Sequence, residues 1–261
     1  MIRLISIFFV FIIFNLSQAQ TNFVVYDKII NTADGNDLDR ENKVLVFDQN
    51  ESLFFDYGGN LDNLDNFLND KNSVIKSSQV IRNTYKESNF QIKDNSFSEE
   101  NIYALDNFQD FKWKIEKGNS KEILGFKCYK ATGNYRGRIY TAWFTPDIST
   151  DIGPWKFRGL PGLILQVSDS DNFYTFQAIK ISLNKLLTTK LSQKFSFKFP
   201  EQKEKFVDYK VYILKENEYI SDIRAKIDAA RPKGLIVVAR SEDREYYIEK
   251  SFEWESEPIK P

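Results

Sequence analysis

Short runs of β-branched and aromatic residues recur along this chain, and each run is bounded by Gly, Pro, Asn, Asp or Ser. The 261 residues include 23 Phe and 13 Tyr. Residues of these kinds favour strands. Strands separated by only a few turn residues pair as antiparallel neighbours, because a parallel pair needs a long crossover. We therefore predict a mainly β (α+β) fold, a curved antiparallel sheet with a helical segment near the C-terminus.

The pattern places the elements as follows. The expected strands are 23–30, 43–48, 52–57, 90–94, 102–105, 111–116, 123–132, 138–144, 163–167 and 173–183, with 235–239 and 246–254 as further candidates. Turn residues at 48–51, 133–137 and 168–172 join consecutive strands. A charged stretch, 201–231, has apolar residues at helical spacing and ends before Pro232, so much of it is predicted to be helical. Residues 61–68 predict a short helix or a loop.

The N-terminus has the three parts of a secretory signal. Arg3 supplies the charge, Leu4 to Phe14 form an apolar run broken only by Ser6, and small residues stand at Ser17 and Ala19. The run is too short for the roughly 20 residues that span a bilayer as a helix. We expect residues 1–19 to be a cleaved signal peptide, so that the mature protein has no integral membrane segment.

The mature chain, 20–261, is expected to form a single domain, because it shows no repeats, Gly/Ser linker or low-complexity tract. It holds no histidine, and the sole methionine is Met1. A zinc or copper site and any catalytic group that needs a histidine base are therefore excluded within one chain. The oxygen-rich segment 34–39 lacks the spacing of an EF-hand Ca²⁺ loop. We expect neither a metal nor another cofactor.

Cys128 is the only cysteine. No intrachain disulfide can form, so the fold depends on its core. The alternation around Cys128 predicts a buried thiol on a strand face. The expected cleavage site has no cysteine that could carry a lipid, so we predict a protein that is periplasmic or secreted and not lipid-anchored.

Charge gives little indication of a partner. The chain has 36 basic and 37 acidic residues, a net charge of −1, and the two signs are interleaved. Binding to nucleic acid or to an anionic membrane needs clustered positive charge, so neither is expected. The oligomeric state stays open.

The most distinctive segment runs from Ala142-Trp143-Phe144-Thr145-Pro146 to the hexapeptide Gly159-Leu160-Pro161-Gly162-Leu163-Ile164. With its flanks, roughly Ile123 to Val167, it resembles the GLPGLI family, which is named for that hexapeptide. The resemblance implies an exported protein of Bacteroidota-type bacteria. It implies no activity, ligand or catalytic residue.

Two interpretations of this segment remain. In the first, Gly and Pro shape a rigid entry into the next strand, and Leu160, Leu163 and Ile164 reach the core. In the second, an exposed aromatic and cationic platform rims a binding site. The residues of that platform are Trp155, Lys156, Phe157 and Arg158, with Trp143 nearby in the sequence.

For function we favour a non-catalytic envelope protein that binds a peptide, a glycan or a partner protein. One alternative is a carrier with an apolar ligand in a sheet-lined cavity, which a large empty apolar pocket would favour. Another is a histidine-free hydrolase that depends on carboxylates, which would require two carboxylates facing each other in a deep cleft.

Overall fold

The computed structural model describes residues 20–31, 38–70, 72–87, 89–107, 111–186, 191, 199–230, 244 and 247–255. The expected signal peptide, most of the oxygen-rich segment and the candidate strand 235–239 lie outside these residues.

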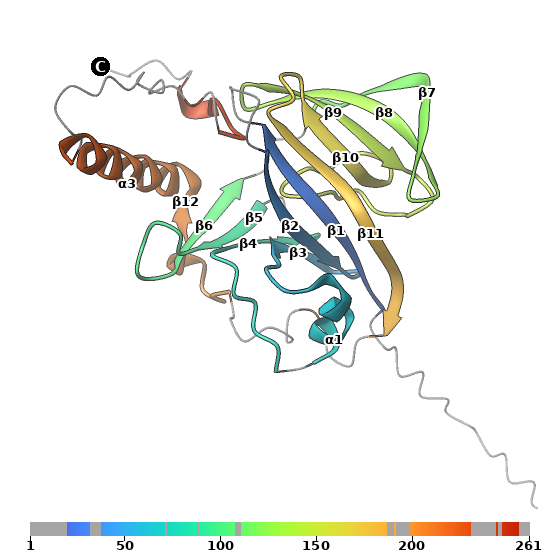
Figure 1. Ribbon diagram of the computed structural model, residues 1–261, viewed down its shortest axis with the longest axis horizontal. Helices are drawn as coiled ribbons and strands as arrows, with labels where there is room; N and C mark the ends of the chain where they lie inside the picture. The colour runs from blue at the N-terminus through green and yellow to red at the C-terminus, as the bar shows by residue number, and fades with distance from the viewer. Residues whose placement is uncertain are drawn as a thin grey trace, which may run out of the picture.

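Twelve strands form one curved sheet, built from two antiparallel meanders (Figure 1). The first meander is β1 (Gln20–Asn31), β2 (Leu38–Phe47), β3 (Glu51–Asp56), β4 (Gln79–Thr84), β5 (Asn89–Asp94) and β6 (Ile102–Asn107). The second is β7 (Lys114–Ile123), β8 (Phe126–Tyr135), β9 (Arg138–Thr145), β10 (Leu163–Asp169) and β11 (Tyr174–Leu186). The long strands β1 and β11 pair and join the two meanders.

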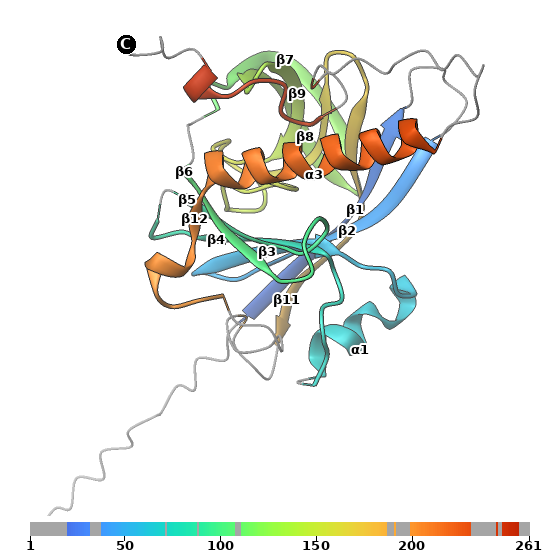
Figure 2. The same cartoon turned by 90° about the vertical axis from the view of Figure 1, so that its left-hand side faces the viewer.

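The predicted mainly β fold is confirmed, with one departure from an all-antiparallel sheet. The short strand β12 (Val207–Asp208) runs parallel to β6 at the sheet edge. It leads into the predicted C-terminal helix, α3 (Tyr209–Ala229), whose N-terminus is capped by the Asp208 side chain. Figure 2 shows α3 continuing from β12, and it packs beside β6 on this side of the sheet.

The remaining helices are short. They are η1 (Leu61–Asn63), α1 (Leu64–Asn69), η2 (Lys203–Lys205) and η4 (Glu253–Glu255). None of the helices in the described part of the chain is both long and apolar enough to cross a membrane.

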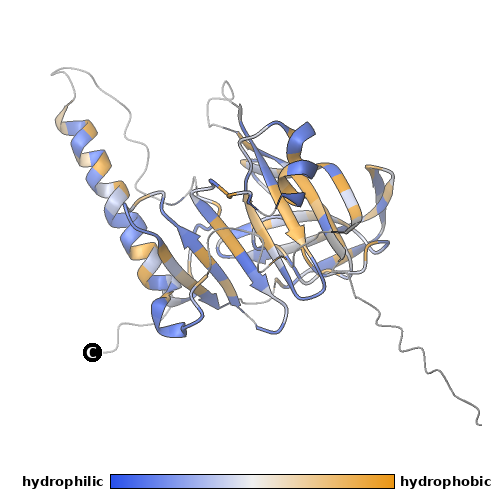
Figure 3. Ribbon diagram, turned by 90° about the horizontal axis from the view of Figure 1, so that it is seen from below, coloured by the Kyte–Doolittle hydropathy of each residue, from blue (hydrophilic) through white to orange (hydrophobic). Residues whose placement is uncertain are grey.

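The sheet carries a hydrophobic core on each face, because successive side chains of a strand point to opposite sides. On the concave face, Tyr26 and Leu45 belong to a core that includes Tyr212 of α3. On the other face, Val25 packs in a core with Leu64 of α1. The apolar colouring of the central strands is visible in Figure 3. A buried side chain of this size contributes about 1.5–3 kcal/mol, so both cores support the sheet without a disulfide.

Cys128 is fully buried, as predicted. Its thiol donates a hydrogen bond to the Phe126 carbonyl oxygen at 3.5 Å. Burial raises the pKa of the thiol to about 11. A thiol in this state acts as a small apolar group of the sheet.

The second meander has one turn that the sequence did not indicate, at Leu124-Gly125, and one that lies within the expected turn 133–137, at Arg136-Gly137. Leu124-Gly125 and Arg136-Gly137 form two-residue turns in which both residues have positive φ, from 42° to 81°. The expected strand 123–132 is therefore split near its start. Gly133, expected in a turn, lies inside β8, and a Cβ at this position would stand 2.8 Å from the Trp113 ring.

Two other differences concern whole elements. Strand β4 was not predicted, since its polar residues hide the alternation of an internal strand. The prediction of a strand at 246–254 is wrong for its described part, which is irregular at residues 247–252 and ends in η4. This part meets the sheet through two amide groups, those of Lys250 and Ser251, which donate to the carbonyl oxygen of Arg136.

The hexapeptide forms the entry into β10 that the first interpretation predicts. Leu160, Leu163 and Ile164 are buried, and β10 begins at Leu163. Gly162 has a φ of 149°, and a Cβ at this position would lie 2.1 Å from the Thr145 carbonyl oxygen. The close approach of β9 to the start of β10 thus requires glycine.

We predict that Gly162→Ala lowers the free energy of unfolding by at least about 3 kcal/mol, because it adds a backbone clash to an unfavourable φ. Urea denaturation followed by tryptophan fluorescence measures the loss. Gly58→Ala is the control, since a Cβ at Gly58 meets no atom within 4 Å. Equal midpoints for the two variants would contradict this account of the motif.

Candidate ligand-binding pocket

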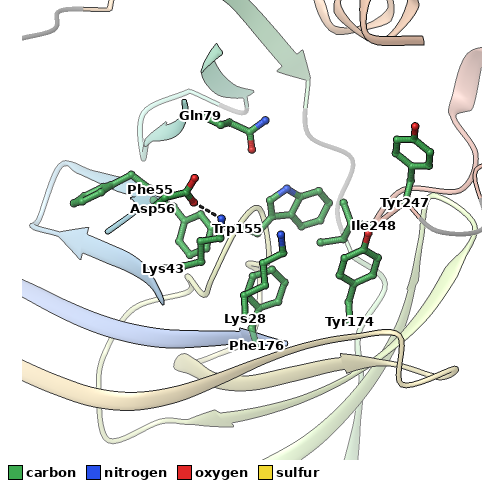
Figure 4. Close-up of a pocket in the computed structure, with 11 residues that line it drawn as sticks. Lys28, Lys43, Phe55, Asp56, Gln79, Trp155, Tyr174, Phe176, Tyr247 and Ile248 are labelled. Atoms are coloured by element: carbon green, nitrogen blue, oxygen red, sulfur yellow. Dashed lines mark hydrogen bonds and ion pairs between the residues drawn. The ribbon is translucent and has the colours of Figure 1, made fainter. Parts of the chain in front are cut away.

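A pocket of about 150 Å³ lies on the concave face, between the sheet, the loop before β10 and the C-terminal segment (Figure 4). Strands β1, β2, β3, β4 and β11 supply its floor and one wall. Its lining residues are Lys28, Lys43, Phe54, Phe55, Asp56, Gln79, Trp155, Tyr174, Phe176, Tyr247 and Ile248. Charged groups and aromatic rings thus share a space with room for a group about the size of a benzene ring.

Cross-strand pairing places the charged groups of the floor. Lys28 is directly opposite Glu41, and Lys43 is directly opposite Asp56. Paired residues share a face of the sheet, so these side chains form a polar row across three strands. The Lys28 Nζ is 3.1 Å from a Glu41 carboxylate oxygen. The Lys43 Nζ is 2.8 Å from the same oxygen and also contacts Asp56.

The row continues across β4 and β5. Gln79 is directly opposite Asp94, and its side-chain nitrogen donates to the Asp94 carboxylate at 2.7 Å. Tyr212 of α3 donates its hydroxyl to the same carboxylate at 2.7 Å. The helix therefore holds one end of the polar row in place.

Burial changes the titration of the groups in this row. Burial, and then the charge of Lys43, lower the pKa of Lys28. Burial would favour neutral Glu41, but its contacts with Lys43 and Lys28 hold the pKa of its carboxyl below the ordinary value. One carboxylate is therefore shared between two ammonium groups on the pocket floor.

Aromatic rings form the walls. Trp155 is buried, with 9% of its surface exposed, and Figure 4 shows its indole facing the two lysines. Its backbone φ is 54°, in the left-handed region that few residues other than glycine adopt. Tyr174 lies on the β11 side, and burial raises the pKa of its hydroxyl to about 12. Both walls present ring surface to a ligand.

Next to Trp155, Lys156 enters a buried ionic cluster. Its Nζ lies 2.7 Å from carboxylate oxygens of both Asp106 and Glu249 and 3.1 Å from the Tyr209 hydroxyl. Arg136 donates two hydrogen bonds to Asp106, at 2.7 and 2.8 Å, and one to Glu249. Two buried cations and two buried carboxylates are thereby compensated.

This ionic cluster connects the walls of the pocket. Lys156 follows Trp155 in the loop, and Glu249 follows Ile248 in the C-terminal segment. The ion pair between Lys156 and Glu249 therefore fastens together the segments that carry two of the lining residues. Tyr209 donates to Glu249 at 2.5 Å and adds the start of α3 to the same cluster.

The structure separates the five residues of the expected platform. Trp155, Lys156 and Phe157 are at most 9% exposed, so the expectation of an exposed platform is wrong. The rings of Trp155 and Phe157 pack in the concave-face core, and the ionic cluster compensates the Lys156 charge. Only Trp155 of these three lines the pocket.

Trp143 and Arg158 lie away from the pocket. Trp143 alternates with the core residues Ala142 and Phe144 along β9, so it points to the other face of the strand. There the Lys121 Nζ stands 4.3 Å from its ring centre. Arg158 forms an ion pair with Asp151 at 3.0 Å.

Sequence reasoning missed the floor of the pocket. A signal was present, since Lys28 continues the inward positions of Val24 and Tyr26, and Lys43 precedes those of Leu45 and Phe47. A lysine at an inward strand position indicates a polar site. The pattern alone could not show that these strands are neighbours of the Trp155 loop.

Comparisons with known proteins agree with this description of the fold. A family described as "Protein of unknown function (Porph_ging)" matches residues 134–166, which include the hexapeptide. No curated protein matches the chain in sequence.

Two solved structures of PNGF-II are similar in fold, one in space group P21 and one in C2. The first has a TM-score of 0.53 at 17% identity over 76% of this chain, and the second 0.55 at 16% over 77%. The chain spans a third of those structures, 33% of each. At this identity the likeness concerns the fold.

We predict that Glu249→Gln lowers the free energy of unfolding by about 3–5 kcal/mol at neutral pH, because Lys156 and Arg136 would share one remaining buried carboxylate. Urea denaturation measures the loss, and limited proteolysis reports release of the C-terminal segment. Glu253→Gln is the matched control. Glu253 also pairs with Arg136, at 2.9 Å, but is 29% exposed, so we expect less than about 1 kcal/mol. Equal losses would contradict a special role for the buried ion pair.

The Glu249→Gln effect should depend on pH. Burial alone would raise the pKa of Glu249, but Lys156 and Arg136 hold it below the ordinary value of 4.5. A carboxyl group whose pKa is lower in the folded state than in the unfolded state stabilises the fold at any pH above its unfolded-state pKa. This stability is lost as the pH falls through the folded-state pKa. The difference in stability between wild type and Glu249→Gln should therefore shrink below about pH 4.5. A difference independent of pH would show that the charge of Glu249 is not its cause.

Proposed function

We propose that this chain is an exported binding protein of GLPGLI type that holds a small ligand, or the end of a peptide or glycan, in the Trp155 pocket. Export is proposed from the signal-like N-terminus, and the absence of a cysteine at its expected cleavage site favours an unanchored periplasmic or secreted protein. The hexapeptide, within the matched residues 134–166, supports the family assignment.

The pocket itself carries the proposal of binding. It combines aromatic walls with a charged floor on a curved sheet, and such a combination of ring surface and a few directed polar groups is typical of ligand sites. Trp155 was singled out from the sequence for binding, and it lies in the wall of this pocket. The lysines of the floor are incompletely buried, at 10% and 21% exposure of their side chains, so a ligand can reach them.

The two alternatives have less support. A carrier of an apolar ligand would need a large apolar cavity, whereas this pocket has two lysines and a carboxylate in its lining. A hydrolase would need a pair of carboxylates that face each other in the pocket. Asp56 is the single acidic residue among the lining residues, and the close pair Asp106 and Glu249 is neutralised in the ionic cluster.

Mass spectrometry of the mature protein, purified gently from its native envelope, tests the proposal. We expect a bound molecule in the wild type and about tenfold less of it in Tyr247→Ala, which removes an aromatic wall. The control is Trp143→Ala, which removes an aromatic ring from the opposite face and should leave the bound amount unchanged. Loss of the molecule in Trp143→Ala but not in Tyr247→Ala, or no bound molecule in the wild type, would overturn the proposal.

A further inference from the structure

The charges in the pocket are unevenly compensated. Lys43 stands between two carboxylates, Glu41 and Asp56. Lys28 has one ion pair in the described part of the chain, with Glu41, and shares that carboxylate with Lys43. Glu41 itself is not among the lining residues, so the lining carries two positive groups and one negative group. The Lys28 ammonium is the least compensated charge that a ligand meets.

An anionic group beside Lys28 would offset two unfavourable effects. The Lys28 side chain is 21% exposed, so its charge has lost much of its hydration. Burial and the nearby Lys43 both disfavour its charged form. A ligand carboxylate supplies the missing negative charge and accepts charge-assisted hydrogen bonds from the ammonium.

A donor and an acceptor remain at the opposite side of the pocket. No acceptor for the Trp155 indole N–H is found within the described ranges, and Figure 4 shows this nitrogen on the Gln79 side of the ring. The Gln79 nitrogen is already bonded to Asp94 and, at 3.2 Å, to Tyr212. Its carbonyl oxygen faces the pocket in the same view. An indole donor beside an amide acceptor complements a ligand amide group, which has one acceptor and one donor.

We propose that the ligand is an N-acylated amino acid or peptide end with a free carboxylate and an apolar side chain. The carboxylate binds Lys28, and the adjacent amide lies between Trp155 and Gln79. The apolar side chain packs on the rings of Phe54 and Phe176. This inference rests on the proposed binding function and specifies its ligand by chemical class.

The first test uses N-acetyl-L-phenylalanine and its neutral analogue N-acetyl-L-phenylalaninamide as probes, with titration calorimetry on the mature protein. The two probes differ only in the charged group. We expect the acid to bind about tenfold more tightly than the amide or better, because a charge-assisted hydrogen bond is about twice as strong as a neutral one.

Variants of Lys28 assign this preference to its charge. Lys28→Met keeps the length of the stem and should abolish the preference for the acid, whereas Lys28→Arg keeps the charge and should retain most of it. Lys130→Met is the matched control, because Lys130 also forms a partly buried ion pair, with Glu116 at 3.1 Å, but is not in the pocket lining. It should bind both probes as the wild type does. Urea denaturation confirms that each variant is folded.

A short peptide that ends in Phe, as free acid and as C-terminal amide, identifies the source of the ligand. Tighter binding of the peptide acid than of N-acetyl-L-phenylalanine indicates a chain end, and the reverse order indicates a free acylated amino acid. Either order supports the inference, provided that the acid form is preferred.

Two results would overturn the inference. Equal binding of acid and amide, with both weakened in Tyr247→Ala, would show that the pocket binds ligands without reading a carboxylate, and the proposed function would stand. Failure of both probes and both peptides to bind the wild type would reject this ligand class. The proposed function would then be judged separately, by the molecule that is purified with the protein.

Discussion

The buried ionic cluster of Lys156, Arg136, Asp106 and Glu249 holds together parts of the chain that the sheet alone does not connect. It joins the tip of one hairpin, the strand β6, the loop before β10 and the C-terminal segment. A buried charge destabilises the fold unless a charge of opposite sign is paired with it. The four groups must therefore be present together. Tyr209 extends the cluster to the start of α3 and thereby fixes the N-terminus of this helix.

The pocket is a consequence of this arrangement. The sheet offers a row of charged side chains, and the cluster brings Trp155 and the C-terminal segment over that row. Because Trp155 is adjacent to Lys156, its position is set by a buried ion pair and not by a mobile side chain on the surface. A pre-formed wall of this kind reduces the ordering cost of binding.

Much of the secondary structure follows from local signals. Ten expected strands overlap strands of the structure, and the helix expected within 201–231 is α3. Alternation of apolar residues succeeds where one face of a strand is buried, as in β1 and β2. It fails at β4, where Gln79 and Asn83 occupy the concave face, and at Leu124-Gly125, where a non-glycine residue takes positive φ. The burial of Lys156 could not be predicted, since a lysine is buried only when distant partners compensate its charge.

The sequence by itself determined the β class, the C-terminal helix, the buried Cys128 and the strand entry formed by Gly159 to Ile164. These features depend on neighbours within a few residues, such as the periodicity of a strand or the φ that a glycine permits. Tertiary structure alone decided that β1 pairs with β11 and that Lys28 and Trp155 line one pocket. It also decided that Trp143 lies outside this pocket. Those relations join residues more than a hundred positions apart, and they are fixed by strand order and by the pairing of buried charges, which no local pattern encodes.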